Sequence, residues 1–250
     1  AIPDVKGARS ALFADLDHDG DLDLVLVGSA GRALYRNNLD GTFTDVTAAY
    51  GLAGGGDSRD AAFADFDDDG RLDLVVVGAS GVTLLRNGGA QRFADVTAAS
   101  GVTAPAATIV AAADYDNDGA IDLFVGGGSE ASLWRNRGNG TFTRDTRSAD
   151  ALQTLRGATI ASATFVDHDN DGSLDLVVGS AGGIVFLRND GTGRLIDRST
   201  ILPAAIRSGG SSVMAVYDVD DDGDEDIAMM DAAGAQHLLR NEGGNANLAV

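Results

Sequence analysis

Short apolar segments alternate with polar, glycine-rich turns along the whole chain, and no stretch keeps a helical period. Apolar runs of this length, rich in Val and Leu and bounded by Gly, are typical of buried β-strands. They lie at 24–27, 74–77, 123–125 and 176–178, with a weaker fifth at 227–230. Another apolar run precedes each of them, as at 11–14 and 161–165, with aspartates in between. The pattern predicts pairs of strands joined by an acidic loop.

A second signature follows each of these strand pairs. An Arg-Asn pair stands 13 or 14 residues after the last aspartate of each loop, directly after strand-forming residues. A Gly-rich turn comes next, and an apolar residue, Phe43, Phe93, Phe142 or Leu195, stands six residues after the Asn in the first four copies. This spacing predicts a third and a fourth strand. The Arg-Asn pairs occupy 36–37, 86–87, 135–136, 188–189 and 240–241.

The resulting four-strand unit occurs five times, at intervals of 50, 49, 53 and 51 residues. Four short antiparallel strands repeated so strictly predict an all-β fold, a five-bladed β-propeller of four-stranded antiparallel blades. A β-sandwich would not repeat its sequence in this way. We expect residues 1–250 to form a single domain with blades at approximately 8–46, 59–96, 108–146, 159–199 and 212–250.

The last unit lacks a clear fourth strand, since Asn247 stands where the others have Phe or Leu. Residues 2–5, Ile-Pro-Asp-Val, align with the fourth strands that begin at Phe43 and Phe93. We predict that residues 2–5 close the last blade, where Pro3 suits an edge strand. The alternative is that 247–250 takes the outer position.

Acidic residues outnumber basic ones by 38 to 18, which gives a formal charge of −20. Such a chain should repel nucleic acid and anionic membrane unless cations occupy its carboxylates. No apolar run approaches the roughly 18 residues of a membrane span. We therefore expect no nucleic-acid partner and no membrane insertion. The absence of cysteine excludes disulfides and thiolate metal sites.

The acid is concentrated, because five nine-residue loops of the form D-x-D-x-D-G-x-x-D hold 25 of the 38 acidic residues. Aspartates occupy positions 1, 3, 5 and 9, and position 7 varies freely, as expected where the backbone carbonyl is the ligand. Carboxylates and a carbonyl form the hard oxygen shell that Ca²⁺ prefers, whereas Mg²⁺ rarely uses such cages. We expect about five Ca²⁺ ions, one per blade. The predicted ligands are Asp15, Asp17, Asp19, Asp21 and Asp23; Asp65, Asp67, Asp69, Arg71 and Asp73; Asp114, Asp116, Asp118, Ala120 and Asp122; Asp167, Asp169, Asp171, Ser173 and Asp175; and Asp218, Asp220, Asp222, Asp224 and Asp226.

Two other interpretations of the loops fail. An EF-hand needs a bidentate Glu at position 12 and flanking helices, but position 12 is apolar in every copy and lies inside the second strand. A simple Asp-Gly hairpin turn explains one aspartate, but not four fixed carboxylates in five copies.

With these loops and the L-x-R-N pattern, the five units resemble the FG-GAP/VCBS repeat family, which includes the integrin α-chain propeller. The L-x-R-N, Gly-turn, Phe pattern is closer to the cartilage acidic protein and bacterial VCBS branch. The resemblance implies a non-enzymatic, Ca²⁺-binding propeller for ligand binding or cell adhesion, which is extracellular, on the cell surface or periplasmic. Integrin-like adhesion in particular is not supported, because the Gly-Ala-Pro of the family is replaced at 28–30, 78–80 and 126–128.

The remaining candidates have plainer interpretations. The Gly-Ser-Ala-Gly type segments at 28–31, 78–81 and 179–182 are expected to be hairpin turns rather than phosphate loops. The three histidines, His18, His168 and His237, form no cluster, and we expect them at the surface. Trp134 is expected to pack in the core, and the repeated arginines to pair with nearby carboxylates or carbonyls.

A ligand site is expected on the variable segments between blades, because binding usually lies on variable loops held by a rigid framework. The segments are about 48–60, 98–108, 147–158 and 199–211. The ligand is an unknown protein or glycan, and three functions stay open: a binding or adhesion module, a carbohydrate-binding or substrate-positioning domain of a polysaccharide-active enzyme, and a self-assembling subunit of a surface fibre. The segments offer Tyr50, Asp57, Arg59, Asp60, Arg147, Asp150, Gln153, Arg156 and Arg207, which we expect to be mostly plain solvated surface.

Overall fold

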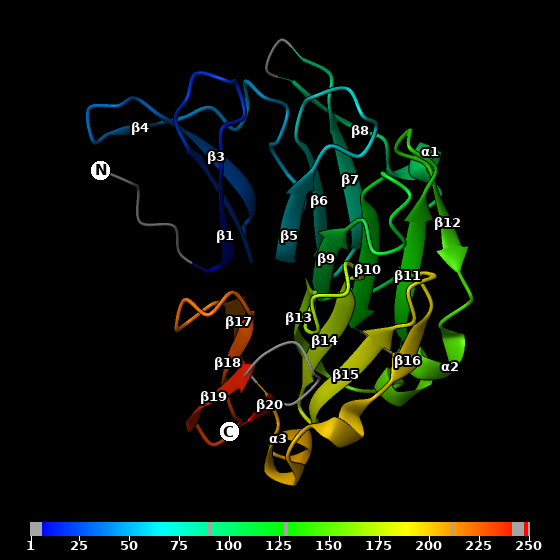
Figure 1. The fold of residues 1–250 in the computed structure, drawn as a ribbon. Coiled ribbons are helices and arrows are strands. Elements are labelled where there is room, and N and C mark those ends of the chain that lie inside the picture. Colours follow the sequence, from blue (N-terminus) through cyan, green and yellow to red (C-terminus); the bar gives the residue numbers. More distant parts are fainter. Residues whose placement is uncertain (1–6, 90–91, 128–129, 212, 242–247, 250) are drawn as a thin grey trace. The chain divides into compact units, whose positions relative to one another are not determined.

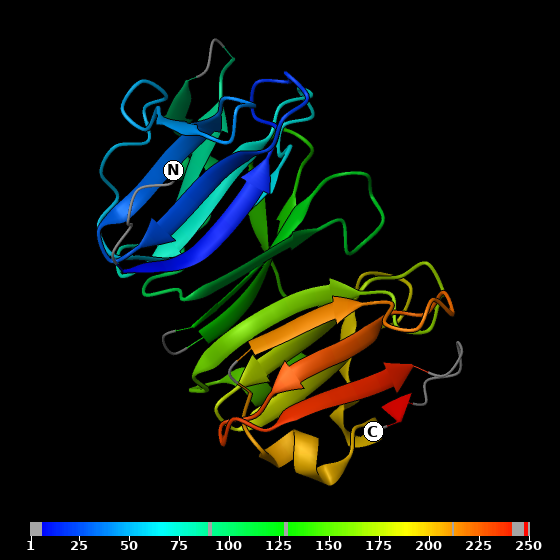
Figure 2. The ribbon, with the colours of Figure 1, turned by 90° about the vertical axis from the view of Figure 1, so that its left-hand side faces the viewer.

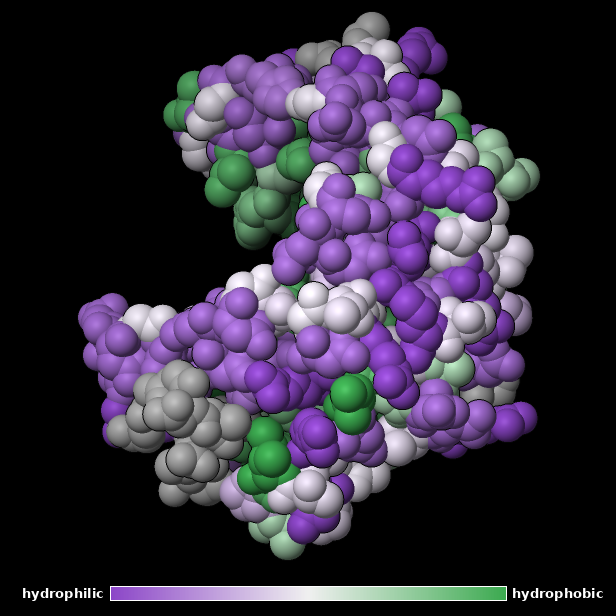
Figure 3. Space-filling view, turned by 45° about the vertical axis from the view of Figure 1, so that its right-hand side comes forward, coloured by the Kyte–Doolittle hydropathy of each residue, from purple (hydrophilic) through white to green (hydrophobic). Residues whose placement is uncertain are grey.

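The protein is described by a computed structural model, which covers residues 7–89, 92–127, 130–211, 213–241 and 248–249. Its strands form five four-stranded antiparallel sheets, each with its strands in chain order (Figure 1). The fold is therefore an all-β propeller with five blades, which confirms the fold class predicted from the repeat. The face seen in Figure 3 is mostly hydrophilic.

The strands of each blade follow one another along the chain. The first blade contains β1 (Ala8–Ala14), β2 (Asp23–Gly28), β3 (Gly31–Asn37) and β4 (Phe43–Asp45). The second contains β5 (Ser58–Ala64), β6 (Asp73–Gly78), β7 (Gly81–Asn87) and β8 (Phe93–Asp95). The third contains β9 (Ile109–Ala113), β10 (Asp122–Gly127), β11 (Glu130–Asn136) and β12 (Phe142–Asp145). The fourth contains β13 (Ile160–Val166), β14 (Asp175–Ser180), β15 (Gly183–Asn189) and β16 (Leu195–Asp197), and the fifth contains β17 (Val213–Tyr217), β18 (Asp226–Met230), β19 (Gln236–Asn241) and β20 (Leu248–Ala249).

Short helices lie in three of the connections between blades. They are α1 (Thr97–Ser100), α2 (Ala149–Leu152), the 3₁₀ turns η1 (Gln153–Leu155) and η2 (Ser199–Ile201), and α3 (Ala204–Ser208). Each spans three to five residues, which is too short to leave a helical period in the sequence. Within the described residues, no helix has the length and hydrophobicity to cross a membrane.

The chain divides into two compact units, which are described separately. The first comprises Ala1–Ala112 and Asn136–Thr143, and the second Ala113–Arg135 and Arg144–Val250. In the first unit, the sheets β1–β4 and β5–β8 share a core that includes Leu16, Val25 and Leu74. In the second unit, the sheets that contain β13 and β17 lie side by side (Figure 2) and share a core that includes Phe186 and Ile227.

The second strand of each blade is the most deeply buried. Every residue of β6, β10 and β14 is buried, as the uninterrupted apolar runs predicted. In the first blade β2 pairs with β3 up to Gly28 opposite Gly31, which leaves a two-residue turn. Gly31 has a φ of 109°, a backbone conformation that favours glycine. These Gly-rich segments are hairpin turns, as predicted.

The outer position of the fifth blade is occupied by β20. Asn241 lies opposite Leu248 and Arg240 opposite Ala249 in the register of β19 and β20. This is the alternative assignment from the sequence. Residues 2–5, for which we predicted this position, lie outside the described residues, and their role stays a prediction.

Candidate metal centre

The first aspartate of every loop closes a tight turn after the first strand of its blade. In the second loop, the carboxylate oxygens of Asp65 accept hydrogen bonds from the backbone N–H groups of Asp69 at 3.1 Å and Gly70 at 2.7 Å. The same pair of bonds recurs at Asp15, Asp114, Asp167 and Asp218. Position 1 is therefore fixed by the loop backbone in all five blades.

The backbone of the loop explains the residue types at positions 4 and 6. Position 4 has a φ between 53° and 59° in all five loops. Asn, Asp and His tolerate this left-handed region better than other residues, and position 4 is His18, Asp68, Asn117, Asn170 or Asp221. The glycine at position 6 has φ values between 81° and 93°, so the sharp turn there requires glycine.

Positions 5 and 7 are joined through the backbone. The carboxylate of Asp69 accepts a hydrogen bond from the backbone N–H of Arg71 at 3.0 Å, and the other loops have the same bond. The residue at position 7 is thus placed by its main chain, which is why its side chain varies. The side chain of Arg71 instead pairs with Asp69 and donates to the carbonyl oxygen of Asn87 at 2.9 Å.

The aspartate at position 9 is the first residue of the second strand and is buried. Asp73 is 2% exposed, and its two oxygens accept hydrogen bonds from the N–H groups of Asn87 at 2.8 Å and Phe66 at 3.2 Å. Burial away from water raises the pKa of Asp73 to about 6, although these hydrogen bonds oppose the change. Burial also raises the pKa of Asp23 and of Asp175.

The aspartate at position 3 is held by the repeated arginine of the same blade. Arg135 Nε lies 2.8 Å from Asp116 Oδ2, and Arg188 Nη2 lies 2.5 Å from Asp169 Oδ2. The equivalent ion pairs join Arg86 to Asp67 and Arg240 to Asp220. This confirms for four of the five repeated arginines that they pair with a carboxylate, and it shows that the carboxylate belongs to the aspartate loop.

The second oxygen of the position 3 aspartate has no such partner. The side chains of Asp67, Asp116 and Asp169 are only 7%, 5% and 9% exposed. Their Oδ1 atoms are buried and accept no hydrogen bond. A buried carboxylate oxygen without a partner is costly, and burial together with the charge of Asp69 raises the pKa of Asp67. A cation in contact with this oxygen would remove that cost.

The structure brings the predicted carboxylates together at this point. Ligand atoms from three acidic residues lie within 4.8 Å of one another in at least four of the loops. A hard divalent cation such as Ca²⁺ fits these residues, because it would neutralise closely spaced carboxylates and satisfy the buried oxygens. The groups include Asp15, Asp17 and Asp19; Asp65, Asp67 and Asp73; Asp114, Asp116 and Asp122; Asp167, Asp169 and Asp171; and His168, Asp169 and Asp175.

The asparagine of the Arg-Asn pair has a role that the sequence analysis missed. The Asn189 side-chain amide donates to the carbonyl oxygen of Tyr115 at 2.8 Å, in the loop of the preceding blade. Asn241 donates to the carbonyl of His168 at 2.6 Å, and Asn136 to that of Phe66 at 2.8 Å. All three acceptors stand at position 2 of a loop, so in these three blades the asparagine joins its blade to the aspartate loop of the preceding blade. Its occurrence in all five copies was the available signal.

Two surface assignments from the sequence are wrong. His168 is 1% exposed, because it occupies position 2, where Leu16, Phe66 and Tyr115 are also buried and Val219 of the fifth loop is 39% exposed. It contacts Asp175 through Nδ1 and Phe186 edge-to-face. Tyr50 is 3% exposed and belongs to the core of the first unit. Trp134 is 5% exposed, as predicted, and donates to Ser132 at 2.9 Å.

Comparison with known proteins agrees with this geometry. FG-GAP-like repeats match residues 15–76, 65–125, 114–178 and 167–229, so the chain belongs to the FG-GAP-like repeat family. No curated protein matches the chain.

Two solved structures are similar in fold. One is a lectin of Agrocybe aegerita that specifically recognises non-reducing terminal N-acetylglucosamine, with 23% identity and a TM-score of 0.65 over 98% of this chain and 66% of the lectin chain. The other is the Photorhabdus luminescens Tc holotoxin pore, with 21% identity and a TM-score of 0.51 over 95% of this chain and 11% of that chain. The chain thus spans less than two thirds of either protein, and at these identities the likeness concerns the fold.

Proposed function

We propose that this chain is a calcium-stabilised propeller module that binds a protein or glycan ligand outside the cytoplasm, as a secreted, surface or periplasmic protein. The observation that carries the proposal is the buried, unpartnered Oδ1 atom of Asp67, Asp116 and Asp169. Extracellular calcium modules bind with Kd values of about 10⁻⁴ to 10⁻³ M, so the loops would be filled at extracellular but not at cytosolic calcium concentrations.

Calcium would act on the loops as a structural ion. When bound, it would supply the positive charge that lets four carboxylates share one small volume. The backbone holds position 1 of each loop, and arginine holds position 3 in four loops. The loops would then keep the blades rigid, and the variable segments at the opposite end of each sheet would be free to bind a ligand.

The family and the lectin-like fold support binding rather than catalysis. We therefore assign the chain no enzymatic activity of its own. One alternative form of the same proposal is a carbohydrate-binding or substrate-positioning role within a polysaccharide-active enzyme. Another is an adhesion role, which the resemblance to the cartilage acidic protein and bacterial VCBS branch implies.

A glycan array tests the proposal when it is probed with calcium-loaded and with calcium-stripped protein. We expect binding that is lost on removal of calcium and restored by Ca²⁺ but not by Mg²⁺. Binding that is unchanged in the stripped protein, or a protein that takes up no calcium in equilibrium dialysis, would contradict the proposal.

Exposed hydrophobic residues favour self-assembly as a second candidate. On β17, Val213 is 56% and Tyr217 is 51% exposed, and on β1, Phe13 is 58% exposed. Exposed apolar side chains gathered on one element can mark an interaction surface. Light scattering and electron microscopy of the purified chain test this candidate: a concentration-dependent polymer is expected, and a strictly monomeric protein would exclude it.

A further inference from the structure

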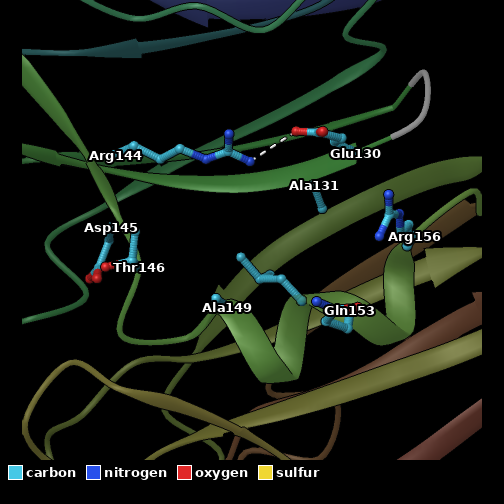
Figure 4. A pocket seen from close by; sticks show the side chains of 9 residues that line it. Glu130, Ala131, Arg144, Asp145, Thr146, Ala149, Gln153 and Arg156 are labelled. Atoms are coloured by element: carbon cyan, nitrogen blue, oxygen red, sulfur yellow. Dashed lines mark hydrogen bonds and ion pairs between the residues drawn. The ribbon is translucent and has the colours of Figure 1, made fainter.

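A pocket opens at the end of the third blade opposite to its aspartate loop (Figure 4). It lies between the start of β11, the end of β12, and the connection that contains α2 and η1. Its volume is about 340 Å³, within the range of about 300–1,000 Å³ that is typical of small-ligand sites. In Figure 4 the ion pair between Arg144 and Glu130 lies along one wall, and α2 with Gln153 lies along the facing wall.

The acidic residues of this pocket are already neutralised. Glu130 pairs with Arg144 at 2.9 Å. The Asp145 side chain is 2% exposed, and it pairs with Arg147 at 2.6 Å and accepts a hydrogen bond from Tyr115 at 2.6 Å. Neither carboxylate is therefore left to repel an anion.

Arg156 is the charged side chain of the pocket lining that has no ion-pair partner among the described residues. It stands directly after η1 and lines the cavity. Across the described part of the chain, its guanidinium makes no ion pair and no side-chain hydrogen bond. In a chain with a formal charge of −20, an unpaired guanidinium in a pocket is a local centre of attraction for an anionic group.

We propose that this pocket binds the carboxylate-bearing ring of an acidic sugar, a uronic acid being the simplest example. Arginine is the side chain that best pairs with a carboxylate, through two parallel hydrogen bonds. Gln153 and Thr146 offer an amide and a hydroxyl for the hydroxyl groups of the ring, and Ala149 and Leu152 give an apolar surface for its C–H groups. The described lining contains no aromatic side chain, so charge rather than ring stacking would select the ligand. The inference rests on the proposed ligand-binding function and names its ligand class.

Galacturonic acid and galactose form a matched pair of probes, because they differ only in the carboxylate. The calcium-loaded protein would be titrated with each sugar, with the methyl ester of galacturonic acid and with N-acetylglucosamine, and binding followed by NMR chemical-shift changes and calorimetry. We expect galacturonate to bind at least tenfold more tightly than galactose or the methyl ester, and more weakly as salt is added. Equal binding of galacturonate and galactose, or a preference for N-acetylglucosamine, would overturn the inference.

Substitution of the arginine locates the site. Arg156→Ala is expected to weaken galacturonate binding at least tenfold and to leave the melting temperature unchanged, since the residue is exposed. Arg137→Ala is the matched control, because Arg137 is also exposed and lies outside the pocket. If both variants bind as the parent does, or if an acidic peptide binds and galacturonate does not, the inference is wrong. Calcium-dependent binding of a neutral glycan in the array would meanwhile leave the proposed function intact.

Discussion

The asparagine between blades gives the sharpest test of how the units are held together. Asn189 is 2% exposed, and its amide donates to the carbonyls of Tyr115 at 2.8 Å and Leu174 at 3.0 Å. Its Oδ1 accepts hydrogen bonds from the N–H groups of Gly191 and Gly193, both at 3.1 Å. The Asn189 side chain therefore forms hydrogen bonds with four backbone groups, which belong to two blades.

Asn189→Ala would leave these four backbone groups without their partner. A hydrogen bond contributes about 0.5–1.5 kcal/mol net, and a buried group that loses its partner costs about 1–3 kcal/mol. We expect the free energy of unfolding to fall by about 3–5 kcal/mol, a large part of the roughly 5–15 kcal/mol of a typical domain. Urea denaturation in saturating calcium measures this change. The only tryptophan, Trp134, lies in the same unit and provides the fluorescence signal.

Asn37→Ala is the matched control. Asn37 is the equivalent residue of the first blade, is only half-buried, and donates to Leu22 within its own blade at 3.3 Å. We expect this variant to lose about 1–2 kcal/mol. If Asn189→Ala costs no more than Asn37→Ala, the bond to Tyr115 contributes nothing and the reasoning is refuted.

Three further predictions concern the loops and turns. Asp222→Ala should lower the melting temperature in calcium more than Asp118→Ala does. The fifth loop holds seven acidic residues and the third only four, so the fifth loop depends more on its bound cation. An equal decrease in melting temperature would contradict this ranking. Gly183→Ala should destabilise the protein by about 1–3 kcal/mol more than Gly172→Ala. A Cβ at Gly183 would lie 2.0 Å from the carbonyl oxygen of Arg207, whereas a Cβ at Gly172 would meet nothing within 4 Å. Equal losses of the free energy of unfolding in urea denaturation would contradict this prediction. In calcium-stripped protein, burial raises the pKa of Asp73 from 3.8 to about 6 and so favours the protonated folded state. The resulting stabilisation of roughly 3 kcal/mol is fully present below pH 3.8 and is lost as the pH rises through 6. The melting temperature of stripped protein should thus fall between pH 5 and 7, whereas in calcium it should rise, because the ion needs deprotonated ligands; parallel pH profiles would refute this.

The fold could be predicted because its signals are local. The apolar runs at 74–77 and 176–178 lie in buried strands. A central strand that is covered on both faces has a continuous apolar sequence, so these runs could be recognised. The glycine at position 6 follows from a left-handed backbone turn that involves only its neighbours. The grouping of Asp65 and Asp67 is also local, because their positions in one loop already place them together.

The features that could not be predicted depend on contacts between distant residues. The bond from Asn189 to Tyr115 joins residues 74 apart in the chain, so no spacing within one unit indicates it. The burial of His168, in contrast, follows from a local pattern. Position 2 is Leu16, Phe66, Tyr115 and Val219 in the other loops. The first three of these are buried, so the apolar character of this position marks it as inward-facing in the first four loops. The pocket beside Arg156 is formed by two strand ends and the connection that contains α2 and η1, a combination that only the structure shows.

Thermal unfolding with and without calcium tests the central claim most directly. At millimolar Ca²⁺ and a Kd of about 10⁻⁴ M, each site adds about 1.4 kcal/mol, so five sites add about 7 kcal/mol. For a chain of 250 residues this corresponds to a melting temperature about 15–25 °C higher in calcium than in excess chelator. We expect this difference together with the uptake of about five ions per chain, and no comparable effect of Mg²⁺. An unchanged melting temperature, with no calcium bound, would contradict it.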